Sequence, residues 1–207
     1  MTSKPLLVLG TANRKKGLEL ERLFAPVGLE LETLADFAEA TEVVEDGETF
    51  ADNAGLKATQ QARCLDRWVL GEDSGLMVDA LGGAPGVFSA RYAGPDADDP
   101  ANNRLLLEQL GQSPLEQRTA RYVCHMTLCD RSGTVRAESE AFCSGRIGFE
   151  PRGTHGFGYD PLFEVLEYHR SFGLLGPSVK ACLSHRARAA RQLIPALTAL
   201  VDSGQWT

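Results

Sequence analysis

Short apolar runs alternate with segments of helical spacing along the first half of the chain. The pattern predicts strand, helix, strand, helix and strand in turn over residues 5–10, 14–24, 29–34, 49–65 and 68–75. Thr49 is a plausible N-cap for the second of these helices, because its hydroxyl can accept a hydrogen bond from the first turn. This alternation is typical of an α/β fold.

The second half of the chain adds a different set of elements. We expect a short helix over 101–110, a β-hairpin of strands 119–130 and 134–147 joined at Arg131–Gly133, and a closing helix over 184–201. The closing helix should bury one face, which carries Ala189, Leu193, Leu197 and either Leu200 or Val201. We therefore predict one domain over 1–207, an α/β fold whose mixed central sheet is flanked by helices, with two lobes and the active-site cleft between them.

Composition narrows the class of protein. The chain has 207 residues, of which 43% are hydrophobic, so it can bury a substantial core. With 28 acidic and 21 basic residues its formal net charge is -7, which argues against a broad surface for nucleic acid. No segment approaches the roughly 20 apolar residues of a membrane span. We therefore expect a cytoplasmic protein that binds neither nucleic acid nor membrane and grips any anion locally.

The spacing of the cysteines and histidines argues against a disulfide framework and against a zinc site. The five cysteines include no C-x-x-C pair, so reduced and mostly buried thiols are expected rather than disulfides. The four histidines lack the spacing of zinc ligands.

Two segments combine charge with special backbone positions. The stretch Gly71–Gly94 holds adjacent acids, Glu72 and Asp73, then a glycine-rich turn and Arg91. Upstream, "TANRKK" joins the first strand to a helix that opens with three cations, and a helix N-terminus is suited to phosphate. The alternative is an ordinary strand-to-helix connection capped by Thr11 or Asn13.

Three other segments are weak signals when taken singly. Asn53 and Lys57 share a helix face after an acidic loop, which also fits an ordinary surface pair. "GFGYDPLF" places aromatic rings on glycine-rich backbone, which suits stacking on a base but also a tight turn. "KACLSHRARA" groups Lys180, His185 and Arg186 around Ser184, either as a binding site or as a basic surface patch.

Taken together, the blocks resemble the inosine/xanthosine triphosphate pyrophosphatase family over Leu6 to about Leu193. The order and spacing match in five blocks, "TANRKK", "ETFADNAGLKA", "EDSGLMVDALGGAPGVFSARYAG", "GFGYDPLF" and "KACLSHRARA". The resemblance implies a homodimer that hydrolyses a small-molecule nucleoside triphosphate (ITP, dITP or XTP) to the monophosphate and pyrophosphate, with Mg²⁺ as cofactor.

The resemblance also implies a role for each motif residue. Glu45 and Asp73 would ligate Mg²⁺, and Asp73 would be the catalytic carboxylate that orients the attacking water and accepts its proton. The residues that would bind the phosphate end or lie beside it are Thr11, Ala12, Asn13, Arg14, Lys15, Lys16, Lys57, Ser74 and Arg91. Those that would contact the base and sugar are Phe157, Gly158, Tyr159, Asp160, Lys180, His185 and Arg186.

This chemistry raises two physical expectations. A carboxylate beside a cation has a lowered pKa and is a weak base, which Mg²⁺ offsets by lowering the pKa of the water. The 6-keto oxygen of hypoxanthine and xanthine calls for N–H donors, which we expect at the start of the last helix near His185 and Arg186. Exclusion of guanine, which shares the keto group, would then depend on crowding of its 2-amino group.

The chain departs from the family pattern at four positions, where Ala12 replaces Gly, Glu72 replaces a second Asp, and Leu174 and Ala181 replace polar residues. Glu72 matters most, since its longer side chain could move a metal ligand or a neighbouring contact. Two rival functions are a pyrophosphatase of the Maf-like group and a nucleotide sensor without activity. The "GFGYDPLF" and "LSHR" segments argue against the first, and retention of both Glu45 and Asp73 argues against the second.

Overall fold

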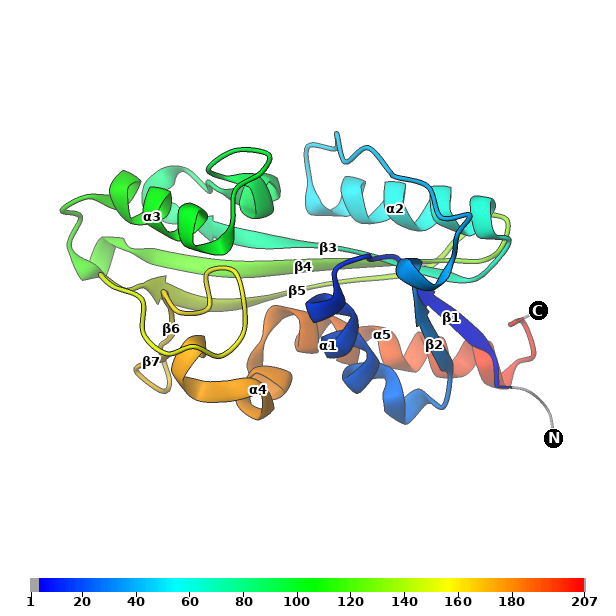
Figure 1. Ribbon diagram of the computed structural model, residues 1–207. Helices are drawn as coiled ribbons and strands as arrows, with labels where there is room; N and C mark the ends of the chain where they lie inside the picture. The colour runs from blue at the N-terminus through cyan, green and yellow to red at the C-terminus, as the bar shows by residue number, and fades with distance from the viewer. Residues whose placement is uncertain (1–3, 207) are drawn as a thin grey trace. The chain divides into compact units, whose positions relative to one another are not determined.

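The computed structural model describes residues 4–206 as a mixed sheet with helices on its faces (Figure 1), which confirms the predicted α/β fold. Within this range seven strands are ordered β2-β1-β3-β4-β5-β6-β7. β1 is parallel to β2 and β3, whereas β6 is antiparallel to β5 and β7. The strands are β1 Leu6–Leu9, β2 Glu30–Thr33, β3 Val69–Val78, β4 Thr119–Cys129, β5 Val135–Ile147, β6 Phe163–Val165 and β7 Arg170–Ser171.

Short polar side chains cap the N-termini of three α-helices in the described chain. The α-helices of the described chain are α1 Arg14–Phe24, α2 Phe50–Leu65, α3 Asp99–Leu110, α4 Phe172–Leu183 and α5 His185–Asp202. Thr49 caps α2 as predicted, in a capping box with Asp52. Asp98 caps α3. These caps satisfy backbone N–H groups that have no partner inside the helix.

The sequence analysis did not predict β6, β7 or α4. β6 and β7 have only 3 and 2 residues, too few to establish a period. α4 contains Pro177 directly after Gly176, whose φ of 76° interrupts the helical conformation. Adjacent glycine and proline are typical of a turn, so the sequence does not indicate a helix there.

The described chain divides into two compact units. Unit 1 comprises residues 4–73, 124–141 and 186–206, and unit 2 comprises Ser74–Val123 and Phe142–His185. β3, β4 and β5 each begin in one unit and end in the other, so the unit boundaries fall within strands.

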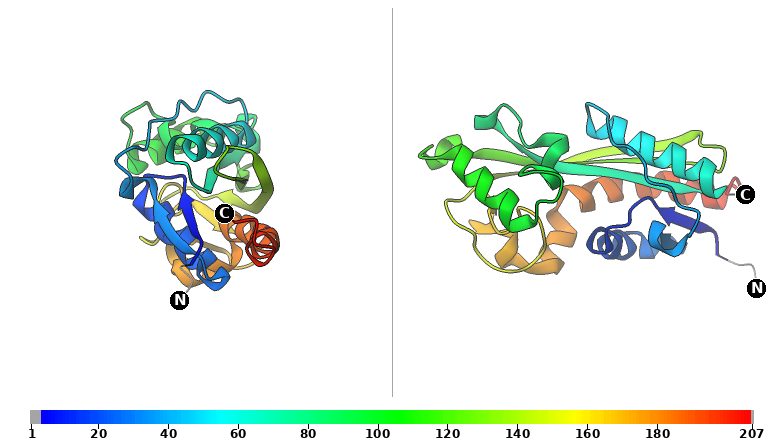
Figure 2. Two further views of the ribbon diagram at one scale, coloured as in Figure 1. Left: turned by 90° about the vertical axis from the view of Figure 1, so that its right-hand side faces the viewer. Right: turned by 45° about the horizontal axis from the view of Figure 1, so that its top comes forward.

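Unit 1 has helices on both faces of its strands, with α2 on one side and α1 and α5 on the other (Figures 1 and 2). Leu7 and Leu9 of β1 belong to the buried cluster that includes residues of α1 and α5, whereas Val8 belongs to the cluster formed with α2. β3 alternates in the same way, because Leu70 packs in the first cluster and Val69 in the second. This alternation decides where the neighbouring acids of β3 point.

The closing helix buries one face in unit 1, as predicted. Ala189, Leu193 and Leu197 are buried, and Leu200 and Val201 pack against the same cluster while partly buried. The remaining positions of the helix are mostly more exposed. The predicted amphipathic pattern is confirmed.

Unit 2 has its own core, which includes Leu76, Leu106, Phe163 and Phe172. Arg118 is buried and donates to the backbone oxygens of Ser113, Gly111 and Gly148, so its guanidinium ties loops together. Backbone carbonyls collected in this way satisfy a buried cation without an ion pair.

The cysteines of the described chain differ in exposure. Cys124, Cys129 and Cys143 are buried, whereas Cys64 and Cys182 are exposed. None of the helices in residues 4–206 combines the length and the apolar character that crossing a bilayer requires.

Candidate active site

Asp73 lies at the centre of a buried polar cluster in unit 1. Lys57 Nζ donates to Asp73 Oδ1 at 3.0 Å and to Glu45 Oε2 at 3.1 Å. Asn53 Nδ2 donates to Asp73 Oδ2 at 3.3 Å, while Asn53 Oδ1 accepts from the backbone N–H of Gly47 at 2.9 Å. α2 supplies both Asn53 and Lys57, whose spacing of four residues puts them on one helix face.

Asn53 was not among the predicted site residues. Its two amide groups have different partners, a carboxylate for the N–H₂ group and a backbone N–H for the carbonyl, which fixes its orientation. Asn53 thereby links Asp73 to the loop that carries Glu45. Its only signal in the sequence is the four-residue spacing from Lys57.

The carboxylates of Glu45 and Asp73 meet at one point, because both accept from the same ammonium nitrogen. Mg²⁺ is commonly held in proteins by one or two carboxylates, with water and substrate phosphate as the other ligands. The donor set of these two residues therefore fits Mg²⁺.

Burial has the largest influence on the pKa of Lys57 and lowers it, but the carboxylates of Asp73, Glu45 and Glu72 together outweigh burial, so the pKa is raised. Burial also has the largest influence on the pKa of Asp73, which it raises. Lys57 and Lys16 act in the expected direction and lower the Asp73 pKa, but burial outweighs them. Lys57 is charged, because its ammonium donates to the two carboxylates of Glu45 and Asp73.

Glu72, the neighbour of Asp73, lies in a second network on the other face of β3. Its Oε2 accepts from Lys16 Nζ at 3.0 Å, and its Oε1 accepts from Arg186 Nη2 at 2.9 Å. Arg186 Nη1 also donates to Glu19 Oε2 at 2.6 Å. Arg186 is 1% exposed and Glu72 2% exposed, so these charges are out of contact with solvent.

The loop before α1 confirms the capping alternative for its polar residues. Asn13 Oδ1 accepts from Lys15 N at 3.0 Å and from Lys16 N at 3.2 Å, and Thr11 Oγ1 accepts from Asn13 N at 3.1 Å. The residues between Ala12 and Lys15 are exposed. A phosphate role for this loop remains a prediction, because capping does not exclude a ligand at the exposed positions.

Unit 2 holds the second cluster of predicted residues. Asp160 Oδ2 accepts from Lys180 Nζ at 2.6 Å and from the backbone N–H of Phe157 at 2.9 Å. Lys180 Nζ also lies 4.3 Å from the centroid of the Phe157 ring, within cation–π range. Phe157 is partly exposed, whereas Asp160 is 1% exposed. Asp160 therefore shapes the turn that presents Phe157.

Residues that the sequence analysis did not select hold this turn in place. Asp99 Oδ2 accepts from Gly158 N at 2.8 Å, and Asn103 Nδ2 donates to Gly158 O at 3.1 Å. Gly158 has a φ of 62°, a conformation that favours glycine. Tyr159 is 3% exposed and donates to the backbone oxygen of Ser89 at 2.8 Å. Of the three aromatic residues in the motif, Phe157 is the one that a ligand can reach, because Tyr159 and Phe163 are buried.

The remaining predicted residues are placed as follows. Arg91 ends a short 3₁₀ helix of unit 2, with its guanidinium carbon 5.4 Å from the Phe88 ring centroid. His185 is buried and stacks on Tyr122, with ring centroids 4.7 Å apart and an interplanar angle of 12°. Ser74 is partly buried on β3.

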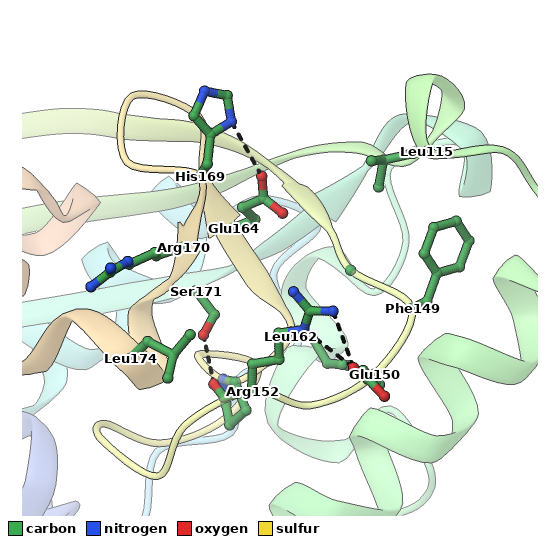
Figure 3. A pocket seen from close by; sticks show the side chains of 12 residues that line it. Leu115, Phe149, Glu150, Arg152, Leu162, Glu164, His169, Arg170, Ser171 and Leu174 are labelled. Atoms are coloured by element: carbon green, nitrogen blue, oxygen red, sulfur yellow. Dashed lines mark hydrogen bonds and ion pairs between the residues drawn. The ribbon is translucent and has the colours of Figure 1, made fainter.

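A cavity of about 130 Å³ in unit 2 contains none of the predicted site residues (Figure 3). Its lining includes Leu115, Phe149 and Leu174, together with an Arg152–Glu150 ion pair. Ligand pockets usually have volumes of about 300–1,000 Å³, so a nucleotide would not fit. Leu174, one of the four departures from the family pattern, lines this cavity.

The structure thus brings the predicted residues together in two groups. In unit 1 it groups Glu45, Lys57 and Asp73, and in unit 2 it groups Phe157, Asp160 and Lys180. Lys16 and Arg186 join neither group directly through the contacts above, and instead share Glu72.

Comparisons with known proteins agree on one family. A family model described as the Ham1 family matches residues 7–196. A dITP/XTP pyrophosphatase of Rhodopirellula baltica is 54% identical over 197 residues, which cover 95% of each chain. One of Geobacillus kaustophilus is 48% identical and covers 90% of this chain and 91% of its own. A HAM1 protein of Coxiella burnetii of known structure has a TM-score of 0.85 at 35% identity, covering 94% of this chain and 98% of its own.

Proposed function

Because the chain belongs to the Ham1 family and is a nucleoside triphosphate pyrophosphatase, we propose that its substrates are non-standard purine nucleotides, namely ITP, dITP and XTP. The products would be the nucleoside monophosphate and pyrophosphate, and Mg²⁺ would be the cofactor. Such an activity removes non-standard purine nucleotides from the nucleotide pool.

The observation that carries the proposal is the meeting of Glu45 and Asp73 at Lys57 Nζ. A protein that only bound nucleotide would have little use for two carboxylates at the phosphate end, since a triphosphate carries about four negative charges. A hydrolase needs both a cation site and a base. The same pair of residues supplies them.

Glu45 and Asp73 would hold the metal. When bound, Mg²⁺ would neutralise phosphate charge and lower the pKa of the attacking water.

Asp73 would orient the attacking water and accept its proton. Burial raises the pKa of Asp73. Bound Mg²⁺ would oppose this shift, but it would also lower the pKa of the water whose proton Asp73 accepts. Asn53 holds one carboxylate oxygen through its amide, and Lys57 holds the other. The base is thereby fixed before substrate arrives, which lowers the cost of reaching the reactive geometry.

Cations would bind the rest of the triphosphate. The side chains of Arg14, Lys15 and Lys16 open α1, where the helix dipole also favours an anion. Lys57 has three donors, and Glu45 and Asp73 accept one each. In unit 2, Arg91 would add a further cation.

The base would stack on Phe157, whose ring is partly exposed and is held by Lys180. For the 6-keto oxygen we propose backbone N–H donors at the start of α5. The Arg186 guanidinium is a weaker candidate for this role, because it already donates to Glu19 and Glu72. An adenine amine would oppose such donors, and a site of this kind can reject the mismatched base by about 10⁴-fold.

We also propose that the protein is a cytoplasmic homodimer. Its ligand would be the nucleotide, and it would bind neither nucleic acid nor a membrane. The formal net charge of -7 supports the absence of nucleic-acid binding, because a negatively charged protein repels the phosphate backbone of a nucleic acid.

The experiment that tests the function is a substrate panel. Purified protein with Mg²⁺ is incubated with ITP, dITP, XTP, ATP and GTP, and pyrophosphate and free phosphate are assayed separately. We expect pyrophosphate from the first three and at least about 10²-fold lower kcat/KM for ATP. Release of free phosphate, or equal rates for ATP and ITP, would contradict the proposal. Nucleotide binding without hydrolysis would instead favour the sensor.

A further inference from the structure

Two adjacent acids on a strand do not face the same side. Asp73 shares its face of β3 with Val69, which packs in the α2 cluster, and Glu72 shares the other with Leu70, which packs with residues of α1 and α5. Gly71 supports this assignment, because a Cβ there would lie 2.1 Å from the Ala54 oxygen of α2. The side chain of Glu72 therefore leaves the strand away from the side of Glu45 and Asp73.

We infer that Glu72 is a positioning residue that holds Lys16 and Arg186, rather than a ligand of the proposed metal site. The inference rests on the proposed function. Both oxygens of Glu72 accept from cations, at 3.0 Å from Lys16 Nζ and 2.9 Å from Arg186 Nη2. Cys124 Sγ adds a weaker donor to Oε1 at 3.4 Å.

The charges of this network balance. Lys16 and Arg186 contribute two positive charges, and Glu72 and Glu19 contribute two negative ones. Charges at such depth are stable only when they are paired and hydrogen-bonded. The side chain of Glu72 is 1% exposed, so a cation entering from solvent has little access to it.

Lys16 is the member of the network through which Glu72 would act on substrate. Its side chain is 20% exposed, and its ammonium carries three donors, so one can bind Glu72 while others bind phosphate. A flexible four-carbon side chain anchored by a buried carboxylate loses less entropy when phosphate arrives. Glu72 thus prepares the phosphate site without touching the metal.

The test compares Glu72→Gln with Glu45→Gln, the same change at a proposed metal ligand. Mn²⁺ binding to the nucleotide-free protein is measured by electron paramagnetic resonance, and KM and kcat are measured for ITP. We expect the Kd of Glu72→Gln for Mn²⁺ to stay within about threefold of the wild-type value. Its KM for ITP should rise about tenfold or more, which corresponds to the loss of one charged hydrogen bond. Glu45→Gln should weaken Mn²⁺ binding about tenfold. An equal loss of Mn²⁺ affinity in both variants would overturn the inference.

Glu72→Asp keeps the negative charge and serves as a second variant if Glu72→Gln does not fold. The shorter side chain cannot reach both cations at once, so the same pattern is expected with a smaller rise in KM. A double-mutant cycle adds Lys16→Met: if Glu72 acts through Lys16, the double variant has no higher KM than Lys16→Met alone. Fully additive effects on KM would overturn the inference. Wild-type turnover of ITP tests the proposed function separately, and Mn²⁺ binding tests Glu72 even without turnover.

Discussion

At the scale of single residues, the surroundings of a carboxylate decide its chemistry. Asp73 accepts from Lys57 and Asn53 and lies close to Glu45, whereas Glu72 is enclosed by Lys16 and Arg186. Burial raises the pKa of Asp73, and its anchored position suits a base. The side chain of the adjacent acid, Glu72, is 1% exposed, against 9% for Asp73.

Asp73→Asn should therefore abolish turnover without unfolding the protein. The amide keeps the size of the side chain and can still accept from Lys57, but it cannot take a proton from water. We expect kcat for ITP to fall at least about 10²-fold, the usual contribution of a positioned base, while calorimetry still detects nucleotide binding. Asp79→Asn is the matched control, since Asp79 accepts a hydroxyl hydrogen bond from Thr119 and is not a proposed site residue. A kcat above about a tenth of wild type would exclude Asp73 from the chemical step.

The residue types of the site were readable from sequence, but their partners were not. Lys57 and Asp73 occupy recognisable motif positions. The amide of Asn53 connects Asp73 to the loop at Gly47 only because that loop folds back onto α2. Arg186 was expected to read the base, and nothing in its motif indicates Glu19, which lies 167 residues earlier in the chain. Long-range pairs of this kind follow from the sheet order, which local spacing does not determine.

At the scale of elements, prediction succeeded where a local signal agreed with the tertiary structure. α2 has both a capping box and a buried face, and β5, which alternates buried and exposed positions, follows β4 across the polar turn of a hairpin. α4 was not predicted because Gly176 and Pro177 interrupt its helical spacing of apolar residues, although tertiary contacts still hold Phe172 in the core. A search for periodic patterns cannot find a kinked helix of two short pieces.

The turn between β4 and β5 depends on one carboxylate. Asp130 Oδ1 accepts from Ser132 N at 2.9 Å and from Thr134 N at 3.2 Å, and Asp130 Oδ2 accepts from Arg136 Nη1 at 3.2 Å. Burial raises the pKa of Asp130, but the hydrogen bonds from Ser132, Arg136 and Thr134 outweigh it, so the pKa is lowered. The contribution to stability is therefore present above the unfolded pKa of about 4 and is lost as pH falls through the native pKa.

Asp130→Asn should lower stability at neutral pH and not in acid. At pH 7 we expect a loss of about 1 kcal/mol, or about 2–4 °C in Tm, because the amide loses the ion pair with Arg136. As pH falls below the unfolded pKa and through the lowered native pKa, the difference between the two Tm values should disappear, since the wild-type carboxyl then takes up a proton. Asp96→Asn, at an exposed loop position, is the control. A constant difference in Tm from pH 7 to pH 3 would show that the charge of Asp130 has no role in the turn.

At the scale of the whole molecule, the proposed metal is expected to serve catalysis and not folding. The chain carries a formal net charge of -7, yet the carboxylates of Glu45 and Asp73 both accept from Lys57, whose pKa they raise, so one of their two negative charges is compensated without a metal. Structural metal sites, by contrast, leave their ligands uncompensated when the metal is removed. The core clusters consist of apolar side chains and contribute to stability independently of any ion.

Chelation should thus remove activity and leave the fold intact. We expect EDTA to abolish ITP hydrolysis, Mg²⁺ to restore it, and the Tm of the nucleotide-free protein to change by less than about 2 °C. Adding Mg²⁺ and ITP at about 100 times Kd to Asp73→Asn, which binds without turnover, should stabilise it by about 2.7 kcal/mol. For a chain of this length that corresponds to about 5–10 °C, measured by differential scanning calorimetry. A fall in Tm of more than about 5 °C with EDTA alone would assign the metal a structural role, because the ion pairs of Lys57 would then not suffice to hold Glu45 and Asp73 together.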